Sequence, residues 1–288
     1  MRTVIPLLLS VLVGLFAGCS RDQSEVPKMS TPNEDAVVVF RSPDGRTLTM
    51  ADLQGLGGTF QYEILGKSSV PAEAESLHKQ ARQAGGAGDY EKAITLLERA
   101  SSLAPAWPYP GYDRAFTELL MGDAENARKH YRKTVELSPR GFFTALTALD
   151  ALDREARGDL PAGTYLAYLS LEWMDDPVEK ADAVRQLIKR VPSFAPAWKE
   201  QATQASTDVE RLAAIEKGLA ANPDGETRGI LLINKALIMD RSGDHEGAVH
   251  LLGELALNPA STYATEHLAK ITLSNMAMSS NRTMEPVR

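Results

Sequence analysis

Side chains that could do chemistry are few and scattered along this 288-residue chain. No two of its five histidines lie four residues apart, which rules out a helical zinc motif. The glycine-rich stretch Gly85–Gly88 lacks the lysine of a phosphate-binding loop, and no Gly-x-Ser-x-Gly nucleophile motif occurs. Glu172, Asp175 and Asp176 are candidate acid–base groups, but they precede Pro177 at an expected helix end, where solvated carboxylates are common. We therefore predict no catalytic residue, no metal site and no cofactor, and a chain that is not an enzyme.

The overall composition limits the possible functions further. The chain carries 38 Asp and Glu against 31 Lys and Arg, which gives a formal net charge of -7 and a sequence pI near 5.4. Nucleic-acid binding needs concentrated Lys and Arg, so we expect no nucleic-acid partner. Hydrophobic residues make up 43% of the chain, which is enough for a substantial core. The single cysteine, Cys19, excludes an intramolecular disulfide, a cysteine-rich zinc site and an iron–sulfur cluster.

The N-terminus has the pattern of an export signal. Arg2 supplies a positive charge, and the uncharged apolar run Val4–Phe16 follows it. A helix of this length spans roughly 20 Å, which is short of the ~30 Å hydrocarbon core of a bilayer. We therefore interpret residues 1–18 as a signal peptide that is removed. Residues 19–35 are polar, contain proline and lack periodicity, so they predict a flexible tether.

The end of this signal, Leu15 to Ser20 (LFAGCS), resembles the bacterial lipobox, in which the cysteine becomes the lipidated first residue of the mature chain. Phe16 stands where that motif prefers an aliphatic residue. The resemblance implies lipid attachment, of the palmitate type, at Cys19 and a lipid-anchored location in the bacterial cell envelope, facing the periplasm. Ser20 after the cysteine favours the outer membrane over the inner one. The alternative is an ordinary secretory signal in which the cysteine occurs by chance.

A small β-rich module is expected at residues 36–70. Two β-prone runs, Val37–Arg41 and Arg46–Met50, flank the turn-forming sequence SPDG and predict a β-hairpin. A short helix is expected at 49–55, and Phe60–Leu65 is a third candidate strand. So few strands are only marginally stable alone, so we expect the module to dock on its neighbour. It would act either as an N-terminal cap on the helices or as an edge that binds a partner.

The remainder of the chain repeats with a period of 34 residues. The pair Gly88-Asp89 recurs as Gly122-Asp123, and looser units continue to a further Gly-Asp pair at Gly243. The other matches at this spacing are Ala93 with Ala127, Leu103 with Leu137, and Pro105 with Pro139. Glycine permits a tight turn between helices, alanine permits close helix packing, and proline ends a helix.

This pattern resembles the tetratricopeptide repeat (TPR) family, whose unit is two antiparallel helices of 34 residues. The resemblance covers roughly residues 73–274 and is weak around 142–210, with three credible repeats, two degenerate ones and a final helix at about 262–274. It implies a mainly α fold, an α-α superhelix of helical hairpins over residues 72–274, whose first helices line a concave surface. Residues 275–288 are predicted to form a disordered tail.

Aromatic residues are only 6% of the chain, yet four fall within ten residues of one another. Trp107, Tyr109, Tyr112 and Phe116 begin the second repeat unit. The last three are three and four residues apart, so they share one helix face. They form either a hydrophobic floor for a partner peptide or the packing between the first two hairpins.

Two further groups complete the candidate surface residues. His78 and Arg82 on the preceding helix could place positive charge at the edge of the groove, although charged residues are the default on an exposed helix. Tyr165, Tyr168 and Trp173 belong to a degenerate unit, where they indicate either core packing or a patch for self-association.

The resulting hypothesis is a non-catalytic, membrane-tethered adaptor that binds partner proteins or peptides in the cell envelope. The candidate groove consists of Tyr109, Tyr112, Phe116, Trp107, His78 and Arg82. Two alternatives remain open: an envelope protein that binds glycan or peptidoglycan fragments, and a structural lipoprotein that assembles into homo-oligomers.

Overall fold

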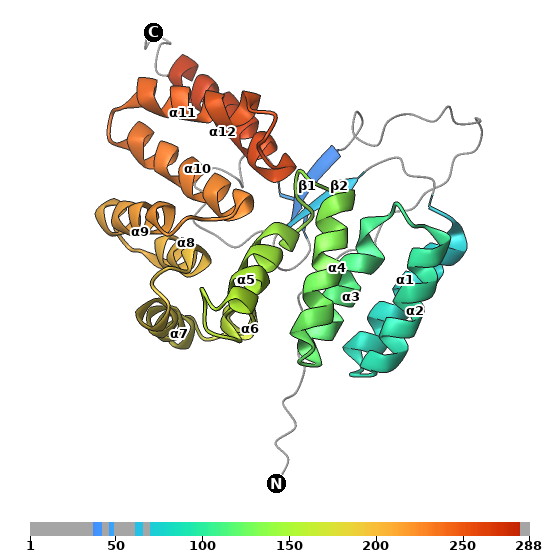
Figure 1. Cartoon of the computed structure of the whole chain (residues 1–288). Coiled ribbons are helices and arrows are strands. Elements are labelled where there is room, and N and C mark those ends of the chain that lie inside the picture. The colour runs from blue at the N-terminus through green and yellow to red at the C-terminus, as the bar shows by residue number, and fades with distance from the viewer. Residues whose placement is uncertain (1–36, 42–45, 49–60, 66–69, 283–288) are drawn as a thin grey trace, which may run out of the picture.

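The computed structural model of this chain describes residues 37–41, 46–48, 61–65 and 70–282, and within these ranges the fold is mainly α-helical (Figure 1). The first helices are α1 (Ala72–Gly86), α2 (Tyr90–Leu103), α3 (Pro108–Leu120), α4 (Ala124–Leu137), α5 (Ala145–Arg157) and α6 (Thr164–Leu169). The later ones are the 3-10 helix η2 (Ser170–Trp173), α7 (Pro177–Arg190), α8 (Ala195–Gln204), α9 (Asp208–Ala220), α10 (Gly225–Arg241), α11 (His245–Leu257) and α12 (Tyr263–Arg282). Cys19, the expected signal peptide and tether, the SPDG turn and the expected 49–55 helix lie outside the described residues.

The recurring Gly-Asp pairs form the turns between helices. Gly88 and Gly122 have φ angles of +80° and +84°, which glycine adopts without steric cost. The aspartates that follow them, Asp89 and Asp123, cap α2 and α4 by accepting hydrogen bonds from backbone N–H groups in the first turn. Each pair therefore reverses the chain and starts the next helix, which explains why the helices come as hairpins.

The predicted fold class is confirmed. Ala93 and Ala127 are almost completely buried, as expected where two helices of a hairpin approach closely. The largest core cluster lies in the middle of the chain and includes the fully buried rings of Tyr131, Tyr165 and Phe194. The middle is also where the repeat is most irregular, because α6 has only 6 residues and continues into η2.

The two halves of the helical chain meet at α5, α10 and α12. In Figure 1 the hairpins follow an arc that brings the orange helix α10 back beside α5. The Thr147 hydroxyl of α5 donates hydrogen bonds to Asp224 and Glu226 at the start of α10, over distances of 2.9 and 3.2 Å. The loop before α5 contacts the start of α12, where the Tyr263 N–H donates to the Arg140 carbonyl at 2.8 Å. An arc closed in this way was not part of the sequence-based expectation.

The predicted β-hairpin has the wrong partner. The strand β1 (Val37–Arg41) pairs antiparallel with β2 (Gln61–Leu65), not with residues 46–50, of which only Thr47 forms a single bridge among those described. In this register Phe40 is opposite Tyr62, and Val38 is opposite Ile64. The third predicted strand is present as β2, and its pairing with the first was not predicted.

The docking of the β-strands also differs from the expectation. The module was expected to cap its sequence neighbour, the first hairpin. Instead β1 lies against α12, and Leu48 packs on the cluster formed by α10, α11 and α12. Among the described residues of the module, Leu48 thus covers apolar surface of the C-terminal helices.

The C-terminal helix is longer than predicted. It was expected to end near residue 274, but α12 continues to Arg282, so the disordered tail predicted from 275 is helical in its first part. Asn275 and Met276 are buried, and Met276 belongs to the core cluster of the last three helices. Among the described residues no helix is both long and apolar enough to cross a bilayer.

Candidate functional site

The local sequence of α3 explains where its aromatic residues point. Pro108 and Pro110 lie in the first turn, where the missing N–H costs no hydrogen bond and the fixed φ favours the helix. Tyr109, Tyr112 and Phe116 then project from one face of this helix, as predicted. All three are half-buried and pack against the main core cluster.

Tyr109 and Tyr112 contact the loop that follows α4. The ring of Tyr109 meets Phe142 and Phe143 edge to face, with centroids 4.8 and 5.5 Å apart. The ring of Tyr112 lies 5.2 Å from Phe143, and its hydroxyl shares a hydrogen bond of 2.8 Å with the Thr144 hydroxyl. Burial raises the pKa of the Tyr112 hydroxyl well above its usual value, so this group stays protonated. The sequence left two roles open for these tyrosines, a floor for a partner peptide or internal packing. At this end of α3 both tyrosines are engaged in internal packing.

Phe142 and Phe143 were not identified from the sequence, although a signal was present. Phe143 lies 34 residues after Tyr109, so the repeat period places the two at equivalent positions of consecutive units. The aromatic surface therefore extends over two repeats. We call the set Trp107, Tyr109, Tyr112, Phe142 and Phe143 the aromatic face.

His78 is not at the edge of a groove, and the prediction that it adds exposed positive charge there is wrong. It is only 3% exposed and lies between α1 and α3. Its Nε2 atom is 2.8 Å from a carboxylate oxygen of Asp113, and its ring contacts Trp107 and Tyr109 edge to face. The Asp113 carboxylate is an acceptor, so this nitrogen carries the proton and donates. His78 thus joins the first two hairpins.

Arg82 and Phe116 lie at a pocket at the other end of the α3 face. The pocket is small and open to solvent, with a volume of about 40 Å³, and lies between α1, α2 and α3. Its walls are Ala81, Arg82, Gly85, Gly86, Tyr90, Leu97, Asp113, Phe116, Thr117 and Leu120. The lack of side chains at Gly85 and Gly86 keeps it open beside the polar groups of Arg82 and Asp113. Such a site suits an apolar side chain that carries a polar neighbour.

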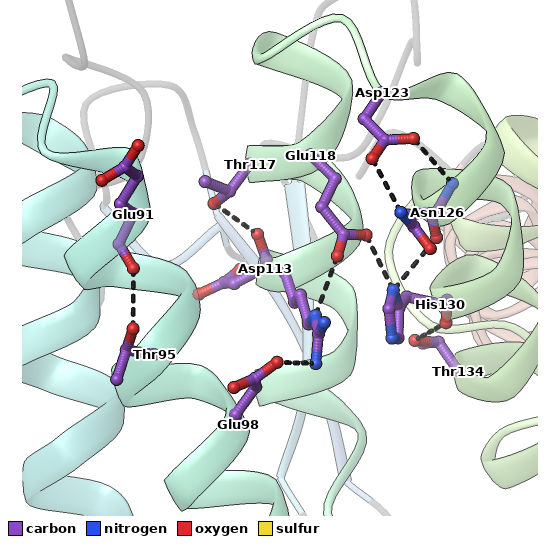
Figure 2. Close-up of polar contacts among 11 residues, drawn as sticks. Glu91, Thr95, Glu98, Asp113, Thr117, Glu118, Asp123, Asn126, His130 and Thr134 are labelled. Atoms are coloured by element: carbon purple, nitrogen blue, oxygen red, sulfur yellow. Dashed lines mark hydrogen bonds and ion pairs between the residues drawn. The ribbon is translucent and has the colours of Figure 1, made fainter.

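An ion network joins α2, α3 and α4 next to this pocket (Figure 2). Glu118 is only 4% exposed, and its carboxylate accepts a hydrogen bond of 2.8 Å from Arg114 Nε. Its other oxygen lies 2.7 Å from His130 Nδ1, while Arg114 also pairs with Glu98 at 2.9 Å. Figure 2 shows the Glu118 carboxylate turned toward His130. The network holds the pocket-forming helices in register and leaves no charge of Glu118 unmatched.

The second aromatic group divides between core and surface. Tyr165 and Tyr168 are buried, whereas Trp173 is 41% exposed. The Tyr168 hydroxyl lies 2.8 Å from Lys199 Nζ and 3.2 Å from a Glu200 oxygen. Burial by itself lowers the pKa of the Lys199 ammonium, but Tyr168 and Glu200 outweigh this effect and raise the pKa. The core interpretation therefore holds for the two tyrosines.

The carboxylates that were candidates for acid–base chemistry lie at or near helix ends. Asp176 caps α7 by accepting hydrogen bonds from the Val178 and Glu179 N–H groups. Glu172 keeps an exposed surface, yet loss of water from its surroundings raises the pKa of its carboxyl, with Lys199 acting in the opposite direction. Among the described residues, no group of three or more His, Cys, Asp or Glu side chains is arranged to hold a metal ion.

No family model matches this sequence, and no curated protein matches it either. Solved structures that are similar to parts of the chain are helical-repeat proteins. MamA (residues 41 to the end) from Desulfovibrio magneticus RS-1 is 14% identical over 76% of this chain and 100% of its own, with a TM-score of 0.31. YrrB, described as a TPR protein with an unusual peptide-binding site, is 11% identical over 74% and 100%, with a TM-score of 0.28. The flexible tandem repeat domain of a bacterial cellulose synthase is 21% identical over 74% and 99%, with a TM-score of 0.30.

Proposed function

We propose that this chain is a non-catalytic adaptor that binds a segment of a partner protein along α3. The observation that carries the proposal is the open pocket between α1, α2 and α3. It places the half-buried side chains of Arg82, Tyr90 and Phe116 around one hollow. Apolar walls with a few polar groups can recognise an extended peptide. The glycan alternative gains no support, because the rings of Trp107 and Tyr109 are engaged in contacts with His78.

The proposal includes attachment to the bacterial cell envelope through lipid on Cys19. The support is the sequence alone: the apolar run before this residue, the small residues around it, and its being the only cysteine in the chain. Several acyl chains on one residue bind a bilayer firmly, whereas one chain binds only marginally. Replacing Cys19 with serine should abolish incorporation of labelled palmitate and move the protein out of the membrane fraction. Unchanged labelling would contradict this part of the proposal.

Site-specific photo-crosslinking tests the peptide-binding part. A benzophenone amino acid at Tyr90 points into the pocket, and the same group at Val209, which is 81% exposed on α9, serves as the control. We expect a discrete crosslinked partner from position 90 in living cells and none from position 209. The additional change Phe116→Ala should weaken the adduct, because it removes one wall of the pocket. Adducts that are absent, or equal from both positions, would exclude this pocket as the binding site.

A further inference from the structure

The loop between α4 and α5 is attached to the C-terminal helix through Arg140. The guanidinium of Arg140 forms an ion pair with Glu266, and its Nε donates to the Ser261 carbonyl at 3.0 Å. The same group lies 4.4 Å from the centre of the Tyr263 ring. Together with the bond from the Tyr263 N–H to the Arg140 carbonyl, these contacts span more than 120 residues of sequence.

The residue after Arg140 permits this close approach. Gly141 has a φ of +98°, a conformation that residues with a Cβ adopt only with strain. A Cβ added there would lie 3.1 Å from a Glu226 oxygen and 3.3 Å from Thr262 Cβ. The loop backbone is therefore pressed against the starts of both α10 and α12.

The next three residues contact the aromatic face. Phe142 is buried against Tyr109, and Phe143 contacts both Tyr109 and Tyr112. Thr144 hydrogen-bonds the Tyr112 hydroxyl, as described above. Five consecutive residues thus divide into two that contact the C-terminal hairpins and three that contact α3. The two sets of contacts are therefore directly adjacent in the sequence.

Phe143 itself is strained. Its φ is +49°, which is a rare conformation for a bulky non-glycine residue. Such a conformation persists only where the surroundings enforce it. Here the enforcing contacts are the ring packing on α3 and the attachment of Arg140 to α12. A strained, half-buried aromatic side chain at this position is suited to be exchanged for another aromatic side chain.

We propose that Arg140 latches this loop to α12, so that Phe143 occupies the Tyr109–Tyr112 end of the surface that a partner's aromatic side chain would otherwise take. The inference rests on the proposed function and states which residues the partner segment needs. One residue would enter the pocket at Phe116. A second, aromatic residue would displace Phe143 at a point one to two helical turns of α3 away from that pocket. The C-terminal hairpin then controls access to the binding surface of the second repeat. The device is an autoinhibitory contact built from the chain's own loop.

Hydrogen exchange on the full-length protein tests the latch without a ligand. The change Arg140→Ala should speed exchange in peptides covering residues 141–148 about tenfold, because the loop opens locally. Exchange in α1 and α2 should stay as in wild type. Arg185→Ala is the matched control, because it removes an exposed ion pair with Asp182 on α7. Glu266→Gln tests the same contact from the other side, in case the arginine variant does not fold.

The outcomes separate the latch from general instability. Faster exchange confined to residues 141–148 and the start of α12, in either latch variant and not in the control, supports the latch. Unchanged exchange in residues 141–148, or an equal increase throughout the chain, overturns it.

Peptide binding tests the autoinhibition and keeps it distinct from the proposed function. Fluorescence anisotropy would compare a set of twelve-residue peptides with two aromatic side chains against the same peptides with leucine at those positions. Arg140→Ala should bind the aromatic peptides at least about fivefold more tightly than wild type and Arg185→Ala do. Equal affinity of all three proteins overturns the autoinhibition while leaving the adaptor function intact. Absence of binding to all three overturns the autoinhibition as well and counts against the adaptor function.

Discussion

Replacing Glu118 with glutamine tests whether the buried ion network stabilises the first two hairpins. Glutamine keeps the shape of the side chain but offers one acceptor oxygen instead of two. His130 Nδ1 also lies 3.0 Å from the Asn126 carbonyl, so both of its neighbours are acceptors and this nitrogen must donate. Arg114 donates from the other side. In the variant one of these two donors faces an NH₂ group and loses its partner.

The expected cost follows from the burial of the carboxylate. A hydrogen bond to a charged group is worth about 1.5–3 kcal/mol, so losing one and weakening the other should lower the free energy of unfolding by about 2–3 kcal/mol. Glu98→Gln is the matched control, since it neutralises a carboxylate that pairs with the same Arg114 but has a side chain 51% exposed. Exposed ion pairs contribute little, so this variant should lose less than about 0.5 kcal/mol.

Urea unfolding followed by far-UV circular dichroism measures both variants against wild type. The m-values should agree, so that a change in midpoint reports a change in stability. A loss at position 118 that is no larger than the loss at position 98 would refute the reasoning. It would mean that water reaches the Glu118 carboxylate in solution, and that the network in Figure 2 does not hold the helices together.

Three further predictions concern the backbone and the closure of the arc. In urea unfolding, Phe143→Gly should be more stable than Phe143→Ala by about 1 kcal/mol, which is the reverse of the usual order. The reason is that only glycine tolerates a positive φ without strain. Equal stability of the two variants would show that the strain is absent. Gly229→Ala should destabilise the protein by about 3 kcal/mol, because the added Cβ would lie 1.9 Å from Thr265 Oγ1. In Gly253→Ala, on α11, the added Cβ would meet nothing within 4 Å, so this variant should be slightly more stable than wild type. Thermal unfolding would detect the contrast. Burial tends to raise the pKa of Glu266, but hydrogen bonds from Lys270 and Arg140 outweigh it and hold the pKa below its ordinary value of 4.5. The ionised Glu266 carboxylate therefore stabilises the protein fully above pH 4.5, and this stabilisation is lost as the pH falls through the lowered pKa. The stability difference between wild type and Glu266→Gln should therefore shrink in acid. A difference that is constant with pH would mean that the ion pair does not form.

The hairpins could be predicted because their determinants are local. A glycine at positive φ followed by a capping aspartate needs no distant partner, and Gly88-Asp89 and Gly122-Asp123 behave in the structure as their sequence indicates. The shared face of Tyr109, Tyr112 and Phe116 follows in the same way from helical spacing.

The partners of those side chains could not be predicted, because they depend on contacts between distant segments. His78 is a surface-type residue in sequence, and only the packing of α3 on α1 buries it against Asp113. The sequence after β1 strongly predicts a turn, yet β1 pairs with β2 across a longer connection. Local turn propensity thus indicated the wrong partner, because strand pairing joins segments that are distant in the sequence.

The irregular middle of the chain explains how the arc can close. In a regular solenoid each unit contacts only its neighbours, so a long stack of identical repeats keeps its ends apart. Here α6 is shortened to 6 residues and continues into η2, which changes the direction of the chain after α5. The later hairpins then return, and Thr147 reaches the start of α10 across 77 residues of sequence. We infer that the weak repeat pattern between residues 142 and 210 is the condition for the contact between Arg140 and α12, since a perfect repeat there would carry the C-terminal hairpins away from the aromatic face.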